Sequence, residues 1–494
     1  MLLAGLDIGS TGCKITVYSQ EGTFLGRIYQ DYPVGRSHSE HEVDPKAIWD
    51  AVRDIIQKAA KVYPCIGGIG IASFGESFAL LDQQDRILFP AMLYTDSRGE
   101  TEAEELAQKL GRERIIEITG TSPAAMYSLP KLMWIRKNKP DIWACTDKIL
   151  LMEDYIVYML TGKRQIDYSL AARTMAFDIQ TLCWSDELCE AAGVDKTLFS
   201  QPVATGTSAG RVKPILCEEL GLAPDTLIVS VSHDQVAAAV GSGIFDESCA
   251  VDGAGTVECI TPVFSSFDAT KLAEGKYAVI PYITPGKYVC YAFLFTGGSL
   301  IDWCVKSIAG YAKIKADETG KRIYNVLEEE WDGNPTDLLL LPHFAGAATP
   351  YMDTGCRGAI LGLSLEHTER DIYIACMEAI CLELRLNIEK LQSAGVTVDT
   401  LRAVGGGAKS NAWMQMKADI LNIPITVLAS EEAGAAGCAM LVGVACGIFK
   451  DIHSAAEILV VPKHTYLPRA AYHSAYENKY QKYLRLYDAV RPLM

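Results

Sequence analysis

The chain has 494 residues, of which 49% are hydrophobic and 21% charged, and its formal net charge is −16. This length exceeds what one hydrophobic core holds, so we expect two domains of roughly 250 residues each. The negative charge argues against nucleic acid or an anionic membrane as a partner, since either would need a basic face. The sequence has 15 cysteines and no C-x-x-C pair, which predicts reduced core thiols and a cytoplasmic location.

A glycine-rich turn follows the first apolar run. Residues 2–8 and 15–18 are predicted to form the strands of a hairpin, and Gly9-Ser10-Thr11-Gly12 joins them. Glycines let successive backbone N–H groups converge on one point and small hydroxyls add donors, which suits a phosphate group. The carboxylate of Asp7, at the strand end, could hold the metal that accompanies nucleotide phosphates. The alternative for this segment alone is a plain tight turn.

The next segments alternate between strand-like and helix-like patterns. Short strand-like apolar runs at 66–72, 228–231 and 338–341 alternate with longer helix-like stretches at 45–62, 101–110 and 372–393. This alternation predicts an α/β protein.

The strand predicted at 229–231 leads through His233-Asp234-Gln235 into an alanine-rich helix. Asp234 therefore lies at the carboxyl end of a strand and at the start of a helix. Its carboxylate could cap the helix, which needs no chemistry. It could instead act as a general base that accepts the proton of an attacking hydroxyl, with His233 and Gln235 orienting the substrate.

The boundary between the domains is predicted at 241–246, so the domains are residues 1–246 and 247–494. No low-complexity linker separates them, and we expect a ligand cleft between them. Just after the boundary, Val251-Asp252-Gly253-Ala254-Gly255-Thr256-Val257 repeats the first turn in altered form. One related turn in each half indicates a duplicated architecture.

Three features follow in the second half. Gly405-Gly406-Gly407 joins a strand to a helix that Ser410 or Asn411 caps, and it leaves room for a flat ligand such as adenine or is a plain βα turn. Residues 433–449 carry no charge and are predicted to form a tightly buried helix rather than a membrane span. Tyrosines at helical spacing over 472–487 are predicted to dock the last helix.

In this order, the motifs resemble the FGGY carbohydrate kinases from residue 6 to about residue 449. The matching segments are 7–14, 42–45, 95–98, 127–134, 232–243, 253–256, 297–303, 357–363 with 375–378, and 405–411. The resemblance implies two duplicated, ribonuclease H-like domains of the actin/hexokinase-type ATPase fold. It also implies ATP- and Mg²⁺-dependent phosphorylation of a primary hydroxyl on a sugar or polyol.

The resemblance also implies residue roles. Asp234 would be the catalytic base, and Asp7 would hold magnesium. The residues that would contact the β- and γ-phosphates are Ser10, Thr11, Lys14, Gly255 and Thr256. The residues that would contact the nucleotide near adenosine are Gly298, Asp302, Gly407, Ala408 and Asn411. The residues expected around the sugar are Gly75, Glu76, Asp96, Arg98, Tyr127, His233 and Gln235.

The acceptor is expected to be a neutral ketose such as xylulose, rhamnulose or fuculose. Xylulokinases tend to have a Met-His pair where Glu76 stands, and Gly-Glu-Arg-Thr-Pro where this chain has Gly346-Ala347-Ala348-Thr349-Pro350. Both departures argue against D-xylulose itself. An acidic sugar is disfavoured beside Glu76 and Asp234, unless Arg98 turns toward it.

Alternative functions remain open at this point. The same family includes kinases of polyols (glycerol, erythritol) and of gluconate, and a homodimer is a possible assembly. A more remote alternative is a non-catalytic, nucleotide-gated protein on the same fold.

Overall fold

The structure is a computed structural model that describes residues 1–494 except 38, 39, 330 and 431. The chain forms two compact units. The first comprises Met1–Phe245, Ala278–Val289 and Glu432–Val461, and the second Asp246–Tyr277, Cys290–Glu431 and Pro462–Met494. The boundary predicted at residue 246 lies next to the change of unit after Phe245. The segments 278–289 and 432–461 belong to the first unit although they follow this boundary. A single division of the sequence at residue 246 therefore places them in the other domain.

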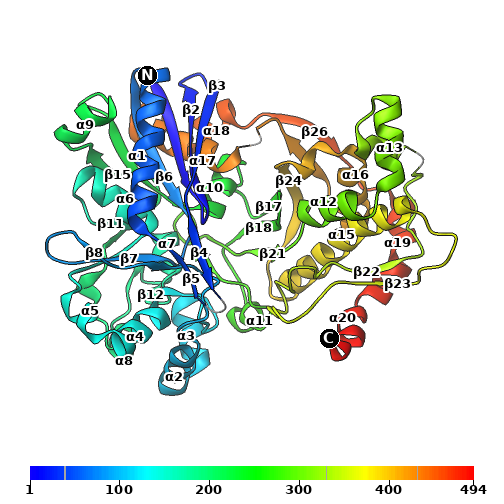
Figure 1. Ribbon diagram of the computed structural model, residues 1–494, viewed down its shortest axis with the longest axis horizontal. Helices are drawn as coiled ribbons and strands as arrows, with labels where there is room; N and C mark the ends of the chain where they lie inside the picture. The colour runs from blue at the N-terminus through cyan, green and yellow to red at the C-terminus, as the bar shows by residue number, and fades with distance from the viewer. Residues whose placement is uncertain (38–39, 330, 431) are drawn as a thin grey trace. The chain divides into compact units, whose positions relative to one another are not determined.

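The first unit is built on a six-stranded sheet in the order β15-β16-β6-β1-β2-β3 (Figure 1). Its strands are β1 (Leu2–Ile8), β2 (Gly12–Ser19), β3 (Phe24–Asp31), β6 (Ile66–Ser73), β15 (Thr207–Arg211) and β16 (Leu227–His233). β1, β2 and β3 form an antiparallel meander, whereas β6 runs parallel to β1 and β16 parallel to β6. The carboxyl ends of β1, β6 and β16 therefore share one edge of the sheet.

The second unit repeats this sheet. Its strands are β17 (Ser248–Ala254), β18 (Glu258–Phe264), β21 (Ala292–Leu294), β24 (Val398–Val404), β25 (Ile425–Leu428) and β26 (Pro462–Tyr466). β17, β18 and β21 are antiparallel, β24 and β25 continue in parallel from β17, and β26 closes the edge antiparallel. The duplication thus extends from the turn to the whole sheet.

Helices cover both faces of the first sheet. α1 (Pro45–Val62) begins where the Asp44 side chain accepts a hydrogen bond from the Lys46 N–H, and Pro45 occupies its first turn. Its buried face shares a core with the Leu6 side of β1. On the other face, α17 (Ala433–Ala445) approaches β1 so closely that a Cβ on Gly5 would lie 2.6 Å from the Ala435 carbonyl oxygen.

Glycines also set the packing of α17 against α10 (Asp234–Gly241). A Cβ on Gly241 would lie 1.8 Å from the Ala433 carbonyl oxygen, and one on Gly437 would lie 2.1 Å from that of Ala237. Any larger residue would force the two helices apart. This confirms the prediction of a tightly packed helix, which ends at Ala445 rather than at 449. No helix in the described part of the chain is long and apolar enough to cross a membrane.

Smaller elements complete the first unit. Its other helices are α2 (Glu100–Leu110), α3 (Arg112–Thr119), α4 (Ser128–Asn138), α5 (Pro140–Cys145), α6 (Met152–Thr161), α7 (Tyr168–Ala172), α8 (Asp186–Ala192), α9 (Pro214–Leu220) and α18 (Ile452–Leu459). Its short strands are β4 (Val34–Ser37), β5 (Glu40–Val43), β7 (Phe78–Leu81), β8 (Ile87–Phe89), β9 (Ala91–Met92), β10 (Lys148–Leu151), β11 (Gln165–Asp167), β12 (Phe177–Asp178), β13 (Cys183–Trp184), β14 (Gln201–Val203), β19 (Ile280–Pro281) and β20 (Tyr288–Val289).

The second unit is rich in helices. They are α11 (Ala269–Glu274), α12 (Gly298–Ser307), α13 (Gly310–Thr319), α14 (Ile323–Glu328), α15 (Glu369–Ser393), α16 (Asn411–Leu421), α19 (Ala470–Tyr483) and α20 (Leu486–Val490), and its short strands are β22 (Leu339–Leu341) and β23 (Ala359–Leu361). Ser410 caps α16 by accepting a hydrogen bond from the Trp413 N–H.

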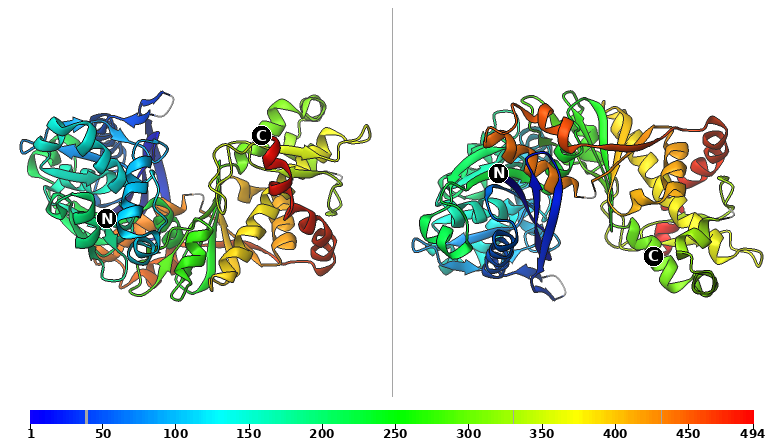
Figure 2. Two further views of the ribbon diagram at one scale, coloured as in Figure 1. Left: turned by 90° about the horizontal axis from the view of Figure 1, so that it is seen from below. Right: turned by 90° about the horizontal axis from the view of Figure 1, so that it is seen from above.

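The C-terminal helix α19 docks through its tyrosines, as the sequence predicts. Tyr476, Tyr480 and Tyr483 are buried. Their hydroxyls donate to carboxylates on α15: Tyr476 to Glu378 at 3.2 Å, Tyr480 to Glu389 at 2.7 Å, and Tyr483 to Glu383. Figure 2 shows α19 and α20, in red, beside α15.

Candidate active site

The end of β16 presents the Asp234 carboxylate without using it as a helix cap. The N-cap of α10 is His233, whose Nδ1 accepts a hydrogen bond from the Gln235 N–H at 3.4 Å. Asp234 is the first residue of the helix, and its buried Oδ1 accepts no hydrogen bond. His233, rather than Asp234, is therefore the N-cap of α10, and Oδ1 of Asp234 remains available to a ligand.

The surroundings of Asp234 favour its protonated form more than water would. Burial, with the charges of Asp7 and Glu76, raises the pKa of Asp234 to about 7. Burial and the nearby Arg173 hold the pKa of His233 well below its usual range. The ring is thus neutral, although its Nδ1 lies 3.2 Å from Asp234 Oδ1, and it brings no positive charge to the carboxylate. A carboxylate with a raised pKa is a stronger base toward a hydroxyl proton.

The first glycine turn lies between β1 and β2. The Gly9 N–H donates to the Gly12 carbonyl at 2.9 Å, which closes the turn. Ser10 is half-buried and Thr11 exposed. Lys14 on β2 places its Nζ 3.2 Å from Asp7 Oδ2 and 2.9 Å from Glu432 Oε2. Burial lowers the pKa of Lys14, but these two carboxylates outweigh it and the net pKa is raised, so the side chain is a cation.

Asp7, the next-to-last residue of β1, lies close to Asp234. A Cβ added to Gly434 would lie 4.0 Å from Asp7 Oδ2 and 3.9 Å from the Asp234 carbonyl oxygen. Within the described residues, no group of three or more His, Cys, Asp or Glu side chains could hold a metal ion. Mg²⁺ in nucleotide-dependent enzymes takes one or two carboxylates, and water and phosphate supply the other ligands. Asp7 fits that role.

Four predicted acceptor-side residues gather around Arg173, which the sequence motifs do not include. Glu76 is 3% exposed, and its Oε1 accepts hydrogen bonds from Arg173 Nε at 2.5 Å and from Arg173 Nη2. The Arg173 guanidinium lies 5.2 Å from the ring of Tyr127. Gly75 has no room for a side chain, because a Cβ there would lie 3.0 Å from Arg173 Cγ and 3.1 Å from His233 Cδ2. Gly75, Glu76, Tyr127 and His233 are thus brought together.

Asp96 and Arg98 bind each other. Asp96 Oδ1 accepts hydrogen bonds from Arg98 N at 3.0 Å and Nε at 2.9 Å, while Arg98 Nη2 lies 2.6 Å from Glu42 Oε1. The Arg98 side chain is 10% exposed and lies 5.2 Å from the ring of Trp134. This network leaves the guanidinium little freedom to turn toward an acidic sugar.

Buried Lys131 joins the loop before Asp96 to the loop before Tyr127. Its Nζ donates to the carbonyls of Leu93 at 2.6 Å and Met126 at 3.1 Å. Burial lowers the pKa of Lys131 to about 8.

In the second unit, the predicted nucleotide residues meet at the end of β17. The Gly298 N–H donates to the Gly255 carbonyl at 2.8 Å, and the Ser299 N–H donates to the Thr256 carbonyl at 3.1 Å. A Cβ on Gly407 would lie 3.1 Å from the Cβ of Ala254. Gly255, Thr256, Gly298 and Gly407 therefore form one backbone surface at the start of α12.

The other predicted nucleotide residues flank this surface. Asp302 lies one turn after Gly298 on α12, so the two share a helix face, and its Oδ1 accepts a hydrogen bond from the Tyr324 hydroxyl at 3.4 Å. Ala408 is buried. Asn411 begins α16, and its Oδ1 accepts a hydrogen bond from the Tyr466 hydroxyl at 2.6 Å.

The aspartates of the two turns have different surroundings. Asp252, the counterpart of Asp7, is fully buried, and its Oδ2 lies 2.6 Å from the Nζ of Lys417, which also binds Glu258. Asp7 keeps 18% of its side chain exposed. Asp252 is therefore committed to a buried ion pair, whereas Asp7 is accessible to a ligand.

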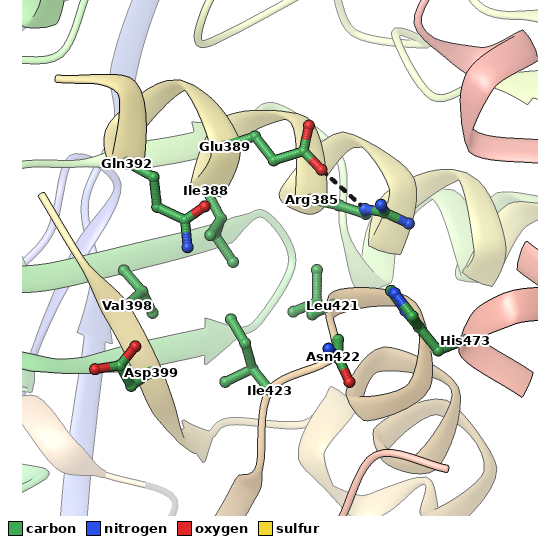
Figure 3. A pocket seen from close by; sticks show the side chains of 10 residues that line it. All are labelled: Arg385, Ile388, Glu389, Gln392, Val398, Asp399, Leu421, Asn422, Ile423 and His473. Carbon is green, nitrogen blue, oxygen red and sulfur yellow. Dashed lines mark hydrogen bonds and ion pairs between the residues drawn. The ribbon is translucent and has the colours of Figure 1, made fainter. Parts of the chain in front are cut away.

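A hollow of about 320 Å³ lies in the second unit at the C-terminal end of α16 (Figure 3). Its lining comes from α15, β24, the segment after α16, and α19, and consists of Arg385, Ile388, Glu389, Gln392, Val398, Asp399, Leu421, Asn422, Ile423 and His473. None of the predicted site residues is in this lining. Its arginine is engaged by Glu389 at 3.0 Å and Glu477 at 2.7 Å.

The repeated sheet, with a glycine turn in each copy, is the architecture of the actin/hexokinase-type ATPase fold. The chain belongs to the FGGY family of carbohydrate kinases: residues 2–241 match the N-terminal domain of this family and residues 254–446 its C-terminal domain. It is a sugar kinase that uses ATP with Mg²⁺.

Among its relatives, the xylulose kinase of Bacillus subtilis (strain 168) is 25% identical over 497 residues, which cover 99% of this chain and 97% of the relative. The xylulose kinase of Escherichia coli (strain K12) is 26% identical over 496 residues and 99% of each chain. A solved structure described as a "xyloylose kinase" from Brucella ovis is 28% identical over 100% of each chain, with a TM-score of 0.88. A gluconate kinase from Lactobacillus acidophilus, 23% identical over 99% of this chain and 98% of its own, shares the fold with a TM-score of 0.89.

Proposed function

We propose that the protein transfers the γ-phosphoryl group of ATP to the primary hydroxyl of a neutral ketopentose of the xylulose type. The observation that carries the chemistry is the Asp234 carboxylate, which does not cap its helix, has a pKa raised to about 7, and lies beside the buried Glu76. The ketopentose class is supported by full-length relatives named xylulose kinases.

In the proposed mechanism, Asp234 accepts the proton of the attacking hydroxyl. Glu76, Tyr127 and Gln235 pair with other hydroxyls of the sugar and hold it in line for attack. Ser10, Thr11 and Lys14 would bind the β- and γ-phosphates, and Gly255 and Thr256 would offer backbone N–H groups to phosphate.

Asp7 would hold Mg²⁺, which neutralises phosphate charge when it is bound. The adenosine would contact Gly298, Asp302, Gly407, Ala408 and Asn411. Asp96 and Arg98 would act on the sugar indirectly, because their mutual hydrogen bonds fix the loop that follows Leu93.

The substrate is tested by steady-state kcat/KM on a panel of acceptors: D- and L-xylulose, D-ribulose, L-rhamnulose, L-fuculose, glycerol, erythritol and D-gluconate. We expect a ketopentose to give the highest value. L-Xylulose is included because a relative from Pasteurella multocida, named a probable L-xylulose kinase, is 24% identical over 99% of each chain. A preference for a polyol or for gluconate would overturn the ketopentose assignment, and sugar-independent ADP release would favour the nucleotide-gated alternative.

The role of Asp234 is tested by Asp234→Asn. A carboxamide cannot accept the hydroxyl proton, so we expect kcat to fall on the order of 10²–10⁴-fold while ATP binding and thermal unfolding stay unchanged. Near-normal turnover in this variant would remove Asp234 from the role of base.

The cytoplasmic location and the homodimer stay predictions. The 15 free cysteines, three of them exposed at Cys65, Cys145 and Cys183, support a reducing compartment. Light scattering on the purified protein measures the assembly, and a mass of one chain would contradict the dimer.

A further inference from the structure

A buried ion pair occupies the acceptor side of the first unit. The side chains of Glu76 and Arg173 are 4% and 6% exposed. Both hydrogen bonds from the guanidinium to Glu76 end on Oε1, which leaves Oε2 as the oxygen that can accept a bond from a ligand hydroxyl. Within the pair the two charges cancel, so Glu76 presents an acceptor atom without a net negative charge.

The short helix α7 fixes this pair relative to Asp234. Asp167 caps α7 by accepting hydrogen bonds from the N–H groups of Ser169 at 3.0 Å and Leu170 at 2.9 Å. The Ser169 hydroxyl accepts a hydrogen bond from the His233 N–H at 2.8 Å, immediately before Asp234. Arg173 is the C-cap of the same helix. One rigid turn therefore connects the end of β16 to the guanidinium.

The other buried cations on this side already have partners. Arg98 is bound by Asp96 and Glu42, and Lys131 by two carbonyl oxygens. Arg36 is exposed, and water weakens its attraction for an anion. A carboxylate that entered beside Glu76 would compete with it for Arg173. If Glu76 lost the guanidinium, it would be a buried carboxylate without a partner, which is strongly unfavourable.

We propose that Glu76 and Arg173 together determine acceptor specificity: Glu76 occupies the guanidinium that would otherwise bind a sugar carboxylate, so the site accepts neutral sugars and rejects aldonates. This inference rests on the proposed function for the position of the acceptor beside Glu76. Specificity then has two parts. Glu76 offers a hydrogen-bond acceptor to a neutral sugar, and the Glu76–Arg173 ion pair makes the binding of an acidic sugar unfavourable.

The test is Glu76→Gln, which keeps the shape of the side chain and removes its charge. Arg173 is then a buried cation whose paired carboxylate has been removed. We expect D-gluconate to bind about 10- to 100-fold more tightly than to the wild type, which is the value of a hydrogen bond to a charged group. We expect kcat/KM for the preferred neutral sugar to fall by a similar factor. Isothermal titration without ATP measures the first quantity, and steady-state kinetics the second.

Two further variants make the test specific. In Glu76→Gln/Arg173→Gln the gain in gluconate binding should disappear, because the cation is gone. Glu42→Gln is the matched control, since it makes the same carboxylate-to-amide change next to Arg98, and it should not change gluconate binding. If Glu76→Gln shows no gain, or the double variant keeps it, the proposal is wrong.

The wild type provides a measurement that does not depend on any variant folding. Gluconate should bind it at least about 100-fold more weakly than the preferred neutral sugar, as expected when a buried polar group loses its partner, and equal binding would overturn the proposal. A wild type that phosphorylates no ketopentose would reject the proposed function. Tight gluconate binding by Glu76→Gln, lost in the double variant, would still confirm the role of Arg173.

Discussion

Asp234 keeps its carboxylate available because the residue before it caps α10. In a helix that begins at a strand end, the first acidic side chain commonly turns back to accept a backbone N–H group. Here the His233 ring takes that role. Burial then keeps the imidazole neutral, so the site gains a helix cap without gaining a positive charge that would lower the basicity of Asp234.

The raised pKa of Asp234 predicts the pH dependence of the reaction. Burial, Asp7 and Glu76 raise this pKa to about 7, and Arg173 acts in the opposite direction. Below that pH the carboxyl group is protonated and cannot accept the hydroxyl proton. We therefore expect kcat/KM to fall about tenfold per pH unit below about 7 and to level off above it. Initial rates measured from pH 5.5 to 9 give this dependence of kcat/KM on pH.

The residual rate of Asp234→Asn provides the control for this pH profile. An asparagine does not ionise, so this rate should not fall below pH 7 in the same way. A wild-type kcat/KM that stays level down to pH 5.5 would mean that the carboxylate that controls the reaction is an unperturbed one.

At the level of single residues, the sequence predicts part of the acceptor side but not all of it. The motifs locate Gly75, Glu76, Tyr127 and His233, which the structure brings together. Arg173 is missing from the prediction because its partner is 97 residues away and it lies in an alanine-rich stretch without a motif. Which side chain caps α10 was also not determined by the sequence, because neighbouring His and Asp residues both carry acceptors.

At the scale of elements, the turn between β24 and α16 illustrates how neighbouring glycines can have different roles. A Cβ on Gly407 would lie 2.8 Å from the Trp413 ring, whereas one on Gly406 meets nothing within 4 Å. Gly407 is required by the packing of its own unit. Gly406 is exposed, and a side chain there would project toward whatever lies over the turn.

We therefore expect Gly406→Val to change mainly ATP binding and Gly407→Val to change mainly the stability of the second unit. Gly406→Val should weaken ATP binding with little change in thermal unfolding. Gly407→Val should lower the stability of the second unit by about 1–3 kcal/mol, the usual cost of overpacking, in addition to any loss of ATP binding through its proposed contact with adenosine. Titration with ATP and thermal unfolding of both variants separate the two effects. If Gly406→Val binds ATP normally, the nucleotide does not lie over this turn.

The longer elements were predictable because their signals are local. Asp44 and Pro45 define the start of α1, and the uncharged, glycine-rich run defines α17. α7 has only five residues, fewer than a periodic pattern needs, so its role in connecting Ser169 to Arg173 emerges only from the fold.

At the scale of the whole molecule, the duplication was predictable but the course of the chain was not. The two glycine turns predicted two related sheets, and both sheets contain an antiparallel three-stranded meander that two further strands extend in parallel. The return of 432–461 to the first unit depends on glycine contacts such as Gly241 with Ala433, which no single segment of sequence encodes. The same holds for Asp252, whose partner Lys417 lies 165 residues away.

Stability of the first unit should depend on pH through carboxyl groups that are buried without a cation. Asp154 is an example: its Oδ2 accepts a hydrogen bond from the Ser200 hydroxyl at 2.6 Å, and its Oδ1 has no partner. Burial raises the pKa of Asp154 from 3.8 to about 8. Burial also raises the pKa of Glu153 and Asp167, so these groups shift stability in the same direction.

The sign follows from proton binding. Between pH about 4 and 8 the unfolded chain has lost the Asp154 proton while the folded chain retains it, so unfolding releases a proton. The stabilisation is complete below pH about 4 and is lost as pH rises toward 8, at up to about 1.4 kcal/mol per pH unit for this group. Asp154→Asn keeps the acceptor for Ser200 and cannot ionise. We expect its free energy of unfolding in urea to exceed that of the wild type at pH 8, and the difference to shrink steadily toward pH 5. The net charge of −16 contributes almost equally to both proteins and cancels in this comparison, so a difference that does not change with pH would show that Asp154 is ionised in the folded state.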